Sequence, residues 1–229
     1  MTPLPPASPL PFAPDAVLFD MDGLMLDSER AINTCFARAA QELGHDLPAS
    51  LWLQMIGGGD GLCRRLLTGR IGAEATEVLL ERAEAMYDAV ADAGIDHRPG
   101  IVELLEFLVA RGIPRAVATS TRRPLAMRKL EAAGLLRYFD AVATSSDVAA
   151  PKPAPDVYLL AASKLGVDPA RCLVLEDSPT GVRAALAAGM TPVQVPDMLV
   201  PDEATHALGH RMVASLGQAQ ALLEVRLAG

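Results

Sequence analysis

The segment VLFDMDGLMLDSE, residues 17–29, places two aspartates, Asp20 and Asp22, directly after a short apolar run. An apolar run of this kind is typical of a strand that is buried on both faces, and aspartate is normally depleted from strands. Two neighbouring carboxylates also raise each other's proton affinity, so the pair lowers stability unless a cation or a reaction uses it. The segment therefore predicts a buried strand that ends in a functional site.

From residue 100 onward, short apolar runs alternate with stretches of helical spacing. This alternation is typical of a parallel sheet with helices on both faces. The three later helices each carry a proline at the expected first helical position, Pro124, Pro155 or Pro179, and end before a glycine. The predicted fold class is α/β, with a Rossmann-like parallel core. The expected strands are residues 16–19, 116–118, 141–143, 172–175 and 193–195, and the expected helices are residues 101–110, 124–133, 155–165 and 179–188.

Residues 28–97 interrupt this alternation, since they contain no convincing strand. Apolar residues recur there at spacings of three and four, first over residues 31–43 and again over residues 74–93. An all-helical insertion of this kind predicts a mobile lid that would exclude water from a site at the strand ends. The predicted parts of the chain are a Pro-rich leader (1–15), a Rossmann-like catalytic core (16–27 and 98–229) and a helical cap domain (28–97).

Composition excludes several classes of function. The chain of 229 residues has a formal net charge of −8, no basic run longer than Arg122-Arg123 and only 4% aromatic residues, which argues against binding nucleic acid or an anionic membrane. No apolar stretch approaches the roughly 20 residues that cross a bilayer. Cys35, Cys63 and Cys172 are far apart and lack metal-ligand spacing, which fits a reducing compartment. We expect a soluble, cytoplasmic protein, and the sequence does not indicate its oligomeric state.

Polar residues also follow other predicted strands. Ligands of open α/β sheets bind outside the carboxyl ends of the strands. Taken singly, each residue has an ordinary interpretation: the hydroxyl pair as a helix cap, the lysine as a solvated surface residue, and the acid pair as the first turn of a helix. Their joint placement beside the aspartate pair predicts a site. These residues are Thr119 and Ser120 after the second strand, Lys152 between two prolines, and Glu176 and Asp177 after the fourth strand.

Four ordered segments, DMDGLMLDSE, VATST, KPAPD and LEDSPTGVRAALAAG, resemble the motifs of haloacid dehalogenase superfamily phosphatases. The resemblance is to the subgroup similar to β-phosphoglucomutase, which carries a helical cap between the first and second motifs. It extends over residues 16–197. The stretches LMLDSER, IPRAVATSTRR and LAAGMTPVQVPD are similar to those of pseudouridine-5′-phosphatase-like and other sugar-phosphate phosphatases.

The resemblance implies a role for each polar residue at the sheet edge. Asp20 would attack phosphorus and form an aspartyl-phosphate, and Asp22 would protonate the leaving alkoxide and then activate water. Thr119 and the backbone N–H of Ser120 would hold the phosphoryl oxygens. Lys152 would balance the charge of Asp20 and of the phosphate.

The same resemblance implies Mg²⁺ as the cofactor. Its ligands would be a carboxylate oxygen of Asp20, the backbone carbonyl of Asp22, and Asp177, with Glu176 as a ligand directly or through water. A hard cation, a lysine and a helix N-terminus after Thr119 would together stabilise the charge of phosphoryl transfer. To act as an acid near pH 7, Asp22 needs a raised pKa, which neighbouring acids and burial under a closed lid favour and the metal opposes.

Other functions fit parts of the pattern. A calcium loop of the EF-hand type would need a glycine at Met25 and oxygen ligands at Leu24 and Ala31. Dehalogenases of the superfamily lack an aspartate at the position of Asp22. A phosphomutase of the β-phosphoglucomutase type carries a basic residue in the cap loop, where this chain has residues 57–60 (GGGD). A non-enzymatic phospho-acceptor would need neither the second aspartate nor a cap.

A phosphatase of a small phosphate monoester, either a sugar phosphate or a nucleotide-like ester, is therefore the expected function. The mutase reading is weakened further because Ile32 stands where that family has a histidine, and it remains the alternative together with the phospho-acceptor. The expected partner is a small phosphorylated metabolite. Candidate residues for contacting the leaving group are Asp27, Asp60, Thr121, Arg122 and Arg123.

Overall fold

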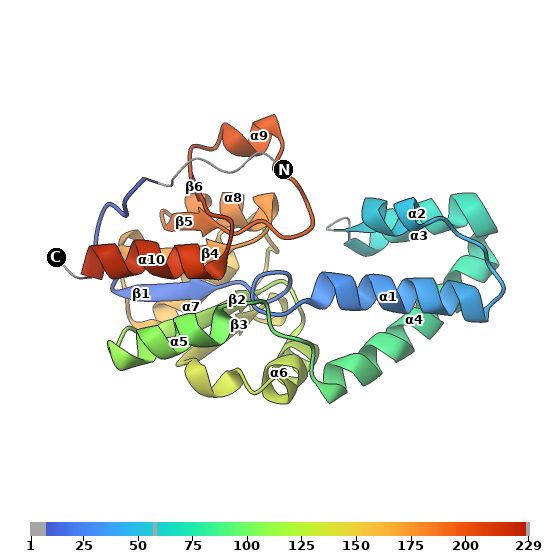
Figure 1. Ribbon diagram of the computed structural model, residues 1–229, viewed down its shortest axis with the longest axis horizontal. Helices are drawn as coiled ribbons and strands as arrows, with labels where there is room; N and C mark the ends of the chain where they lie inside the picture. Colours follow the sequence, from blue (N-terminus) through green and yellow to red (C-terminus); the bar gives the residue numbers. More distant parts are fainter. Residues whose placement is uncertain (1–7, 57–58, 228–229) are drawn as a thin grey trace.

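The computed structural model of the chain describes residues 8–56 and 59–227, and a six-stranded parallel sheet forms its centre (Figure 1). The strand order is β3-β2-β1-β4-β5-β6. Because β2, β1 and β4 are neighbours and parallel, the residues at their carboxyl ends meet at one edge. The strands are β1 (Ala16–Phe19), β2 (Arg115–Thr119), β3 (Ala141–Thr144), β4 (Cys172–Glu176), β5 (Thr191–Gln194) and β6 (Arg211–Met212).

Helices cover both faces of the sheet and also form a separate group beyond its edge. The α-helices of the described residues are α1 (Ser28–Glu42), α2 (Ala49–Met55), α3 (Gly59–Ile71), α4 (Ala73–Ala93), α5 (Ile101–Ala110), α6 (Arg123–Ala132), α7 (Asp156–Leu165), α8 (Pro179–Ala187), α9 (Glu203–His206) and α10 (Leu216–Leu227).

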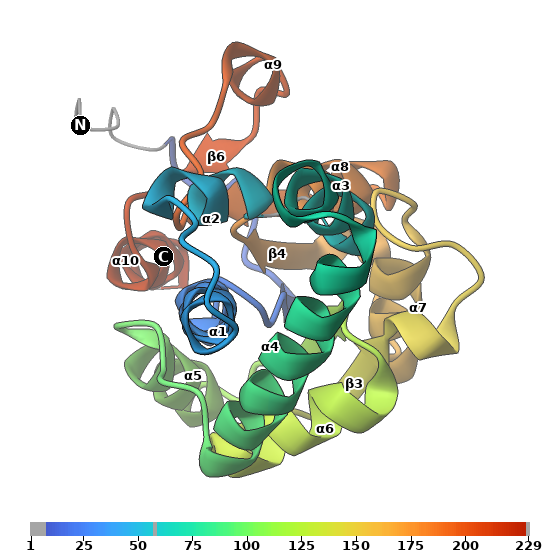
Figure 2. The same ribbon diagram turned by 90° about the vertical axis from the view of Figure 1, so that its right-hand side faces the viewer.

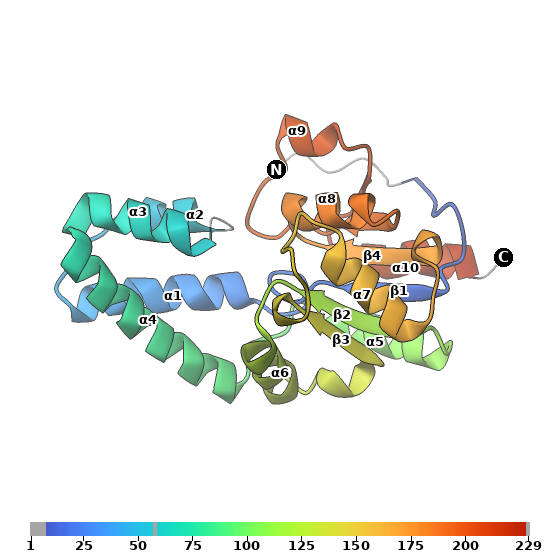
Figure 3. The same cartoon turned by 180° about the vertical axis from the view of Figure 1, so that it is seen from behind.

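The central strand β1 is buried on both faces. Val17 and Phe19 belong to the cluster that packs beneath α5, α6 and α10, whereas Ala16 and Leu18 belong to the cluster beneath α7 and α8. This division follows from the alternation of side chains along a strand. Figure 3 shows α7 and α8 on the near face of the sheet. Full burial of a Val, Leu or Phe side chain stabilises the fold by roughly 1.5–3 kcal/mol. The buried side chains of β1 therefore help to offset the unfavourable free energy of placing two carboxylates at its end.

Helices α1 to α4 form the group beyond the sheet edge, with a hydrophobic cluster of their own. Leu51, Trp52, Leu67 and Leu79 are at its centre. Helix α1 packs along α4, and Figure 2 shows these four helices in front of the carboxyl end of the sheet. Because this cluster is separate from the two clusters on the sheet, the group buries its own apolar surface.

Two segments connect the helical group to the sheet, and they cross side by side. Residues 25–27 and 96–98, here called the crossing pair, are joined by an antiparallel bridge between Leu26 and His97. The N–H of Asp27 donates to the carbonyl of Asp96 at 2.9 Å, and the N–H of Arg98 donates to the carbonyl of Met25 at 2.8 Å. The chain therefore enters and leaves the helical group at a single place.

The expected α/β fold and its first five strands are confirmed, with strand boundaries shifted by at most two residues. Pro155 does not begin a helix, because it is the N-cap residue of α7. Three C-terminal elements, β6, α9 and α10, were not predicted, since no long apolar run marks them. The division of the chain into leader, core and cap domain, and the mobility of the cap, stay predictions.

Two further observations bear on the predicted class of protein. Within residues 8–56 and 59–227, no helix is both long and apolar enough to span a bilayer. All three cysteines lie among the described residues; they are buried, and none forms a disulfide.

Candidate active site

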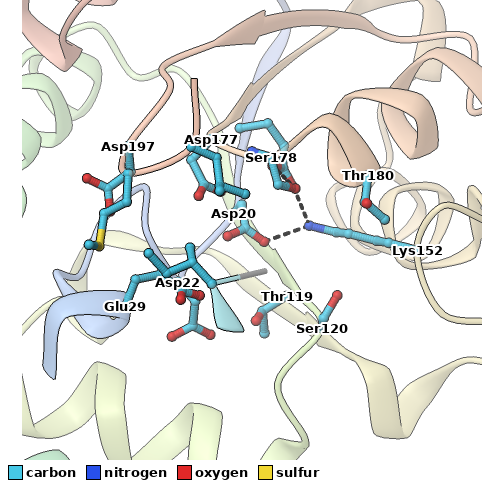
Figure 4. Close-up of a pocket in the computed structure, with 14 residues that line it drawn as sticks. Asp20, Asp22, Glu29, Thr119, Ser120, Lys152, Asp177, Ser178, Thr180 and Asp197 are labelled. Carbon is cyan, nitrogen blue, oxygen red and sulfur yellow. Dashed lines mark hydrogen bonds and ion pairs between the residues drawn. The ribbon is translucent and has the colours of Figure 1, made fainter. Parts of the chain in front are cut away.

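Polar side chains from several segments gather at the carboxyl edge of the sheet. Asp20 follows β1, Thr119 is the last residue of β2, and Glu176 is the last residue of β4. They line a cavity of about 230 Å³ that the loop carrying Lys152 also borders (Figure 4). All seven residues that the sequence predicted for the site line this cavity: Asp20, Asp22, Thr119, Ser120, Lys152, Glu176 and Asp177. The structure brings them together, and their individual roles stay predictions.

Lys152 is the cation of this cavity. Its side chain is only 4% exposed, so it is not the solvated surface lysine that the sequence alone allowed. The ammonium donates to Oδ1 of Asp20 at 2.6 Å and to Oε1 of Glu176 at 2.7 Å. It also lies 3.0 Å from the carbonyl of Ala118 and 3.1 Å from the hydroxyl of Tyr158. Burial lowers the pKa of Lys152, but the charges of Asp20 and Glu176 outweigh it and hold the pKa well above its ordinary value.

The charges around Asp20 determine its proton affinity. Burial raises its pKa, the ammonium of Lys152 lowers it, and the carboxylates of Glu176 and Asp22 raise it again. The result is a pKa raised from 3.8 to about 7. The positive charge of Lys152 alone therefore does not neutralise the carboxylates that face this cavity.

Asp177 has the geometry expected of a ligand for a cation. Its carboxylate forms no ion pair or hydrogen bond within the described part of the chain, and oxygens of Asp20, Glu176 and Asp177 lie within 4.8 Å of one another. Burial, together with the charges of Glu176 and Asp20, holds the pKa of Asp177 well above its ordinary value. A side chain at Gly23 would overlap the carboxylate of Asp177, and its φ of 82° suits glycine.

These three carboxylates fit a divalent cation. All of their donor atoms are hard oxygens, which Mg²⁺ prefers, and a cation would relieve the repulsion that raises the pKa values of Asp20 and Asp177. Glu176 is the most heavily engaged of the three. Its Oε2 accepts from the N–H and the hydroxyl of Ser178 at 2.8 and 2.9 Å, while Oε1 accepts from Lys152 and from the hydroxyl of Tyr158 at 2.7 and 3.0 Å.

Asp22 has different partners. Its Oδ1 forms an ion pair with the ammonium of Lys129, and its Oδ2 accepts a hydrogen bond of 2.6 Å from the hydroxyl of Thr121. Burial alone would raise the pKa of Asp22, but the charge of Lys129 and the hydrogen bonds from Lys129 and Thr121 hold it below its ordinary value. This contradicts the expectation of a raised pKa, because a second buried lysine offsets the neighbouring acids.

The end of β2 supplies the hydroxyl groups of the cavity. Thr119 is 1% exposed, and its Oγ1 accepts a hydrogen bond of 3.0 Å from the N–H of Thr121. Ser120 is exposed, and its side chain borders the same cavity. The helix expected after Thr119, over residues 124–133, is α6, which begins at Arg123.

Three of the five candidates for leaving-group recognition have structural partners. Thr121 holds the second aspartate of the pair, as described above. Arg123 donates from Nε to Oδ1 of Asp147 at 2.9 Å, and Asp27 accepts from Nη1 of Arg30 at 2.7 Å. These contacts account for the three side chains without a ligand.

Arg122 and Asp60 are the other two candidates. Arg122 is exposed at the N-cap position of α6. The side chain of Asp60, like residues 57 and 58 of the glycine run, lies outside the described part of the chain. Ile32 lines a different cavity, between the helical group and α6, together with Tyr87 and Leu125.

Sequence reasoning missed two residues of the site. Tyr158 of α7 is fully buried and donates to Glu176 at 3.0 Å. Lys129 of α6 is 2% exposed and pairs with Asp22. Neither has a local signal, because a tyrosine and a lysine inside amphipathic helices are ordinary helix residues. The proline and serine of the Ser178-Pro179 pair could have identified the N-cap that holds Glu176.

Comparison with known proteins gives the family. The model of the family described as "Hydrolase: haloacid dehalogenase-like hydrolase" matches residues 14–189, which is most of the chain. The protein belongs to the haloacid dehalogenase-like hydrolases. This confirms the family expected from the four sequence motifs, and with it the assignment of the chain as a hydrolase.

Two relatives and one solved structure that are similar to this hydrolase match it over most of their length. A phosphorylated carbohydrates phosphatase from Thermotoga maritima is 32% identical, over 77% of this chain and 82% of its own. Hexitol phosphatase A from Escherichia coli is 35% identical, over 83% of this chain and 90% of its own. The crystal structure of a HAD family hydrolase from Deinococcus radiodurans, with bound phosphate and sodium, has a TM-score of 0.78 and 32% identity, and the match covers 93% of this chain and 97% of that one.

Proposed function

We propose that this hydrolase is a Mg²⁺-dependent phosphatase that cleaves a small phosphate monoester through a phosphorylated Asp20. The observation that carries the proposal is the arrangement around Asp20. A buried lysine lies 2.6 Å from one of its oxygens, and the partnerless carboxylate of Asp177 lies nearby. A carboxylate flanked by a lysine and a cation site suits attack on an anionic phosphate, since both positive charges offset the repulsion between the reactants.

The residues of the chain divide the reaction between them. Asp20 attacks phosphorus, and Lys152 balances the negative charge that Asp20 and the phosphoryl group share. Thr119 and the N–H of Ser120 hold phosphoryl oxygens at the end of β2. Asp22 gives a proton to the leaving oxygen and later takes one from water, so that Asp20 is released unchanged.

Asp20, Asp177 and the backbone carbonyl of Asp22 would hold Mg²⁺, with Glu176 beside them. When bound, the ion supplies positive charge next to the phosphoryl oxygens, which is the main requirement of phosphoryl transfer. The acceleration needed for hydrolysis of a phosphate monoester reaches up to ~10²¹-fold, so a site with this many fixed charges is expected.

Hydrolysis is favoured over phosphomutase chemistry by the charges around the cavity. A mutase must bind a second phosphate, which needs a free cation. Lys152 is the one basic residue among the described residues that line the cavity, and it is already shared by two carboxylates. The acidic side chain of Glu29 also borders the cavity and would repel a second phosphate.

A sugar phosphate or a similar hydroxyl-rich ester is the proposed substrate. Two relatives with about one third identity carry the names phosphorylated carbohydrates phosphatase and hexitol phosphatase A, which supports this substrate class. A cytoplasmic location is also proposed, because the three widely spaced cysteines fit a reducing compartment.

A phosphatase assay tests the proposal. Purified protein should release inorganic phosphate from hexitol and hexose phosphates with Mg²⁺, and EDTA should abolish the release until Mg²⁺ is restored. Asp20→Asn should remove activity while keeping the fold, and Asp168→Asn, at an exposed turn before β4, is the matched control. Transfer of phosphate between two positions of a sugar would instead support a mutase. A phosphorylated Asp20 that forms without turnover would support a phospho-acceptor.

A further inference from the structure

A second buried lysine stands beside the aspartate pair, and the proposed reaction leaves it without a role. Lys129 of α6 is 2% exposed, and its ammonium pairs with Oδ1 of Asp22. Placing a lysine in the interior is costly unless the charge is paired. The other oxygen of Asp22 is held at 2.6 Å by Thr121, so α6 and the loop before it fix both carboxylate oxygens.

Lys129 also contacts the helical group. Its ammonium lies 5.1 Å from the centre of the Tyr87 ring on α4. Next to it in sequence, Arg128 pairs with Asp88 and Asp92 of the same helix at 3.3 and 2.7 Å. Helix α4 therefore packs on α6 through two adjacent basic residues, of which only Lys129 reaches the site.

These contacts fix the orientation of the Asp22 carboxylate but leave some of its hydrogen-bond acceptor positions open. A carboxylate has about four positions at which it can accept a hydrogen bond, and Lys129 and Thr121 account for two of them. The side chain of Asp22 is 24% exposed and borders the cavity, so it remains accessible to a leaving group. Lys129, in contrast, is too buried to reach a substrate.

We propose that Lys129 is a positioning residue that holds Asp22 in the orientation needed for proton transfer and links this orientation to α4 through Tyr87. The inference rests on the proposed function and deepens it. In the first step, the bond from phosphorus to the leaving oxygen breaks as the bond to Asp20 forms, and the leaving oxygen takes the proton of Asp22. In the second step, water attacks phosphorus, its proton passes to Asp22, and the bond to Asp20 breaks.

Two esters with different leaving groups distinguish positioning of the acid from general damage. An alkoxide needs a proton as it leaves, whereas p-nitrophenolate leaves readily without one. For Lys129→Met we expect kcat/KM on sorbitol 6-phosphate to fall by roughly 10-fold to 100-fold, the cost of misplacing a catalytic group by about 1 Å. On p-nitrophenyl phosphate, kcat/KM should fall by less than about 3-fold, because kcat/KM reports the steps through release of the leaving group and that release needs no proton here. Equal losses on both esters, no loss, or faster turnover would overturn the proposal.

Two variants serve as controls for the charge and for the interface. Lys129→Arg keeps the charge and should retain most of the rate on sorbitol 6-phosphate. Arg128→Met removes a contact with α4 at the adjacent residue but none with Asp22, so it should leave the ratio of the two rates unchanged. If Arg128→Met reproduces the selective loss, packing of α4 explains the effect and Lys129 has no positioning role.

A double variant tests the link to Asp22. Asp22→Asn alone should show the same selective loss, and adding Lys129→Met should not increase it, because the two residues act as one unit. A further large loss in the double variant contradicts the proposal.

Thermal unfolding gives a readout that does not depend on activity. Lys129→Met should lower the Tm by leaving the carboxylate of Asp22 without its partner, and adding Asp22→Asn should restore part of the loss. No restoration would overturn the pairing itself. If the wild-type protein hydrolyses neither ester while this restoration is seen, the proposed function fails and the pairing stands, so the two failures are distinguishable.

Discussion

Two aspartates one residue apart experience opposite electrostatic environments. The pKa of Asp20 is raised to about 7, because burial and the neighbouring carboxylates outweigh Lys152. The pKa of Asp22 is lowered despite its burial, because Lys129 adds a charge that the local sequence does not reveal. A lowered pKa keeps Asp22 ionised, so that its carboxylate is available to take a proton from water, although it is a weaker base than an ordinary aspartate. In the proposed reaction, the phosphate dianion would raise the proton affinity of Asp22 when it binds, which suits the earlier step, in which Asp22 would give a proton to the leaving oxygen.

The raised pKa of Asp20 should make the metal-free protein less stable as the pH rises. Between about pH 4 and pH 7, the folded protein holds a proton on Asp20 that the unfolded chain releases, so stability falls through this window. Asp20→Asn cannot ionise. Its Tm, measured in EDTA by calorimetry, should therefore rise relative to wild type from pH 4 to pH 7.5.

Asp147 provides a control with the opposite sign. Its hydrogen bond with Arg123 holds its pKa below the ordinary value, so its contribution is present above about pH 4 and is lost as the pH falls. Asp147→Asn should lower the Tm at pH 7 and have less effect at low pH. If the Tm difference from wild type changes with pH in the same direction for both variants, the explanation of the raised pKa of Asp20 by burial and neighbouring charges is wrong.

At the scale of elements, α8 packs on the end of β4 so closely that Gly181 has no room for a side chain. A Cβ at this position would overlap Oε1 of Glu176, the atom that also binds Lys152. Alanine is the better helix former, and the change from glycine normally stabilises a helix interior by about 1 kcal/mol. We expect Gly181→Ala to do the reverse: it should lower the Tm and lower kcat/KM, since Glu176 must move away from Lys152.

Gly69 of α3 is the matched control for this prediction. It also lies inside a helix, but no atom comes within 4 Å of a Cβ built there. Gly69→Ala should therefore raise the Tm and leave kcat/KM unchanged. An increase in Tm for both variants would show that Glu176 has more room than the structure indicates.

The sequence predicts elements well where a local pattern encodes them. The ends of β1, β2 and β4 were found because apolar runs followed by polar residues are visible within a few positions. The partners of Asp22 could not be found in this way, since Lys129 lies 107 positions away on another element. Strand β6 was not predicted for a different reason. It has only two residues, Arg211 and Met212, which is too short for a hydrophobic period to be detected.

At the scale of the whole molecule, Asp197 ties the crossing pair and the helical group to the sheet. Its side chain is 2% exposed and accepts from Arg30 of α1 and from Arg98 of the crossing pair, both at 2.8 Å. A hydrogen bond to a charged group contributes roughly 1.5–3 kcal/mol to stability. Solvent screening lowers this figure here, because both arginines are partly exposed. Asp197→Asn should therefore lower the Tm by several degrees and speed hydrogen exchange at residues 25–30 and 96–98.

Asp27→Asn is the control for this junction. Asp27 also pairs with Arg30, but the two side chains are 28% and 46% exposed, so the pair should contribute little. We expect its Tm and its exchange rates to stay near those of wild type. Equal effects of the two substitutions would mean that Asp197 does not hold the junction.

The crossing pair has a consequence for how such enzymes diversify. Because entry and exit of the insertion are adjacent, one contiguous stretch of the gene can be lengthened, shortened or exchanged without rethreading any strand. Under the proposed function, selection could alter substrate recognition through that stretch alone, while the residues at the carboxyl edge of the sheet evolve under a separate constraint.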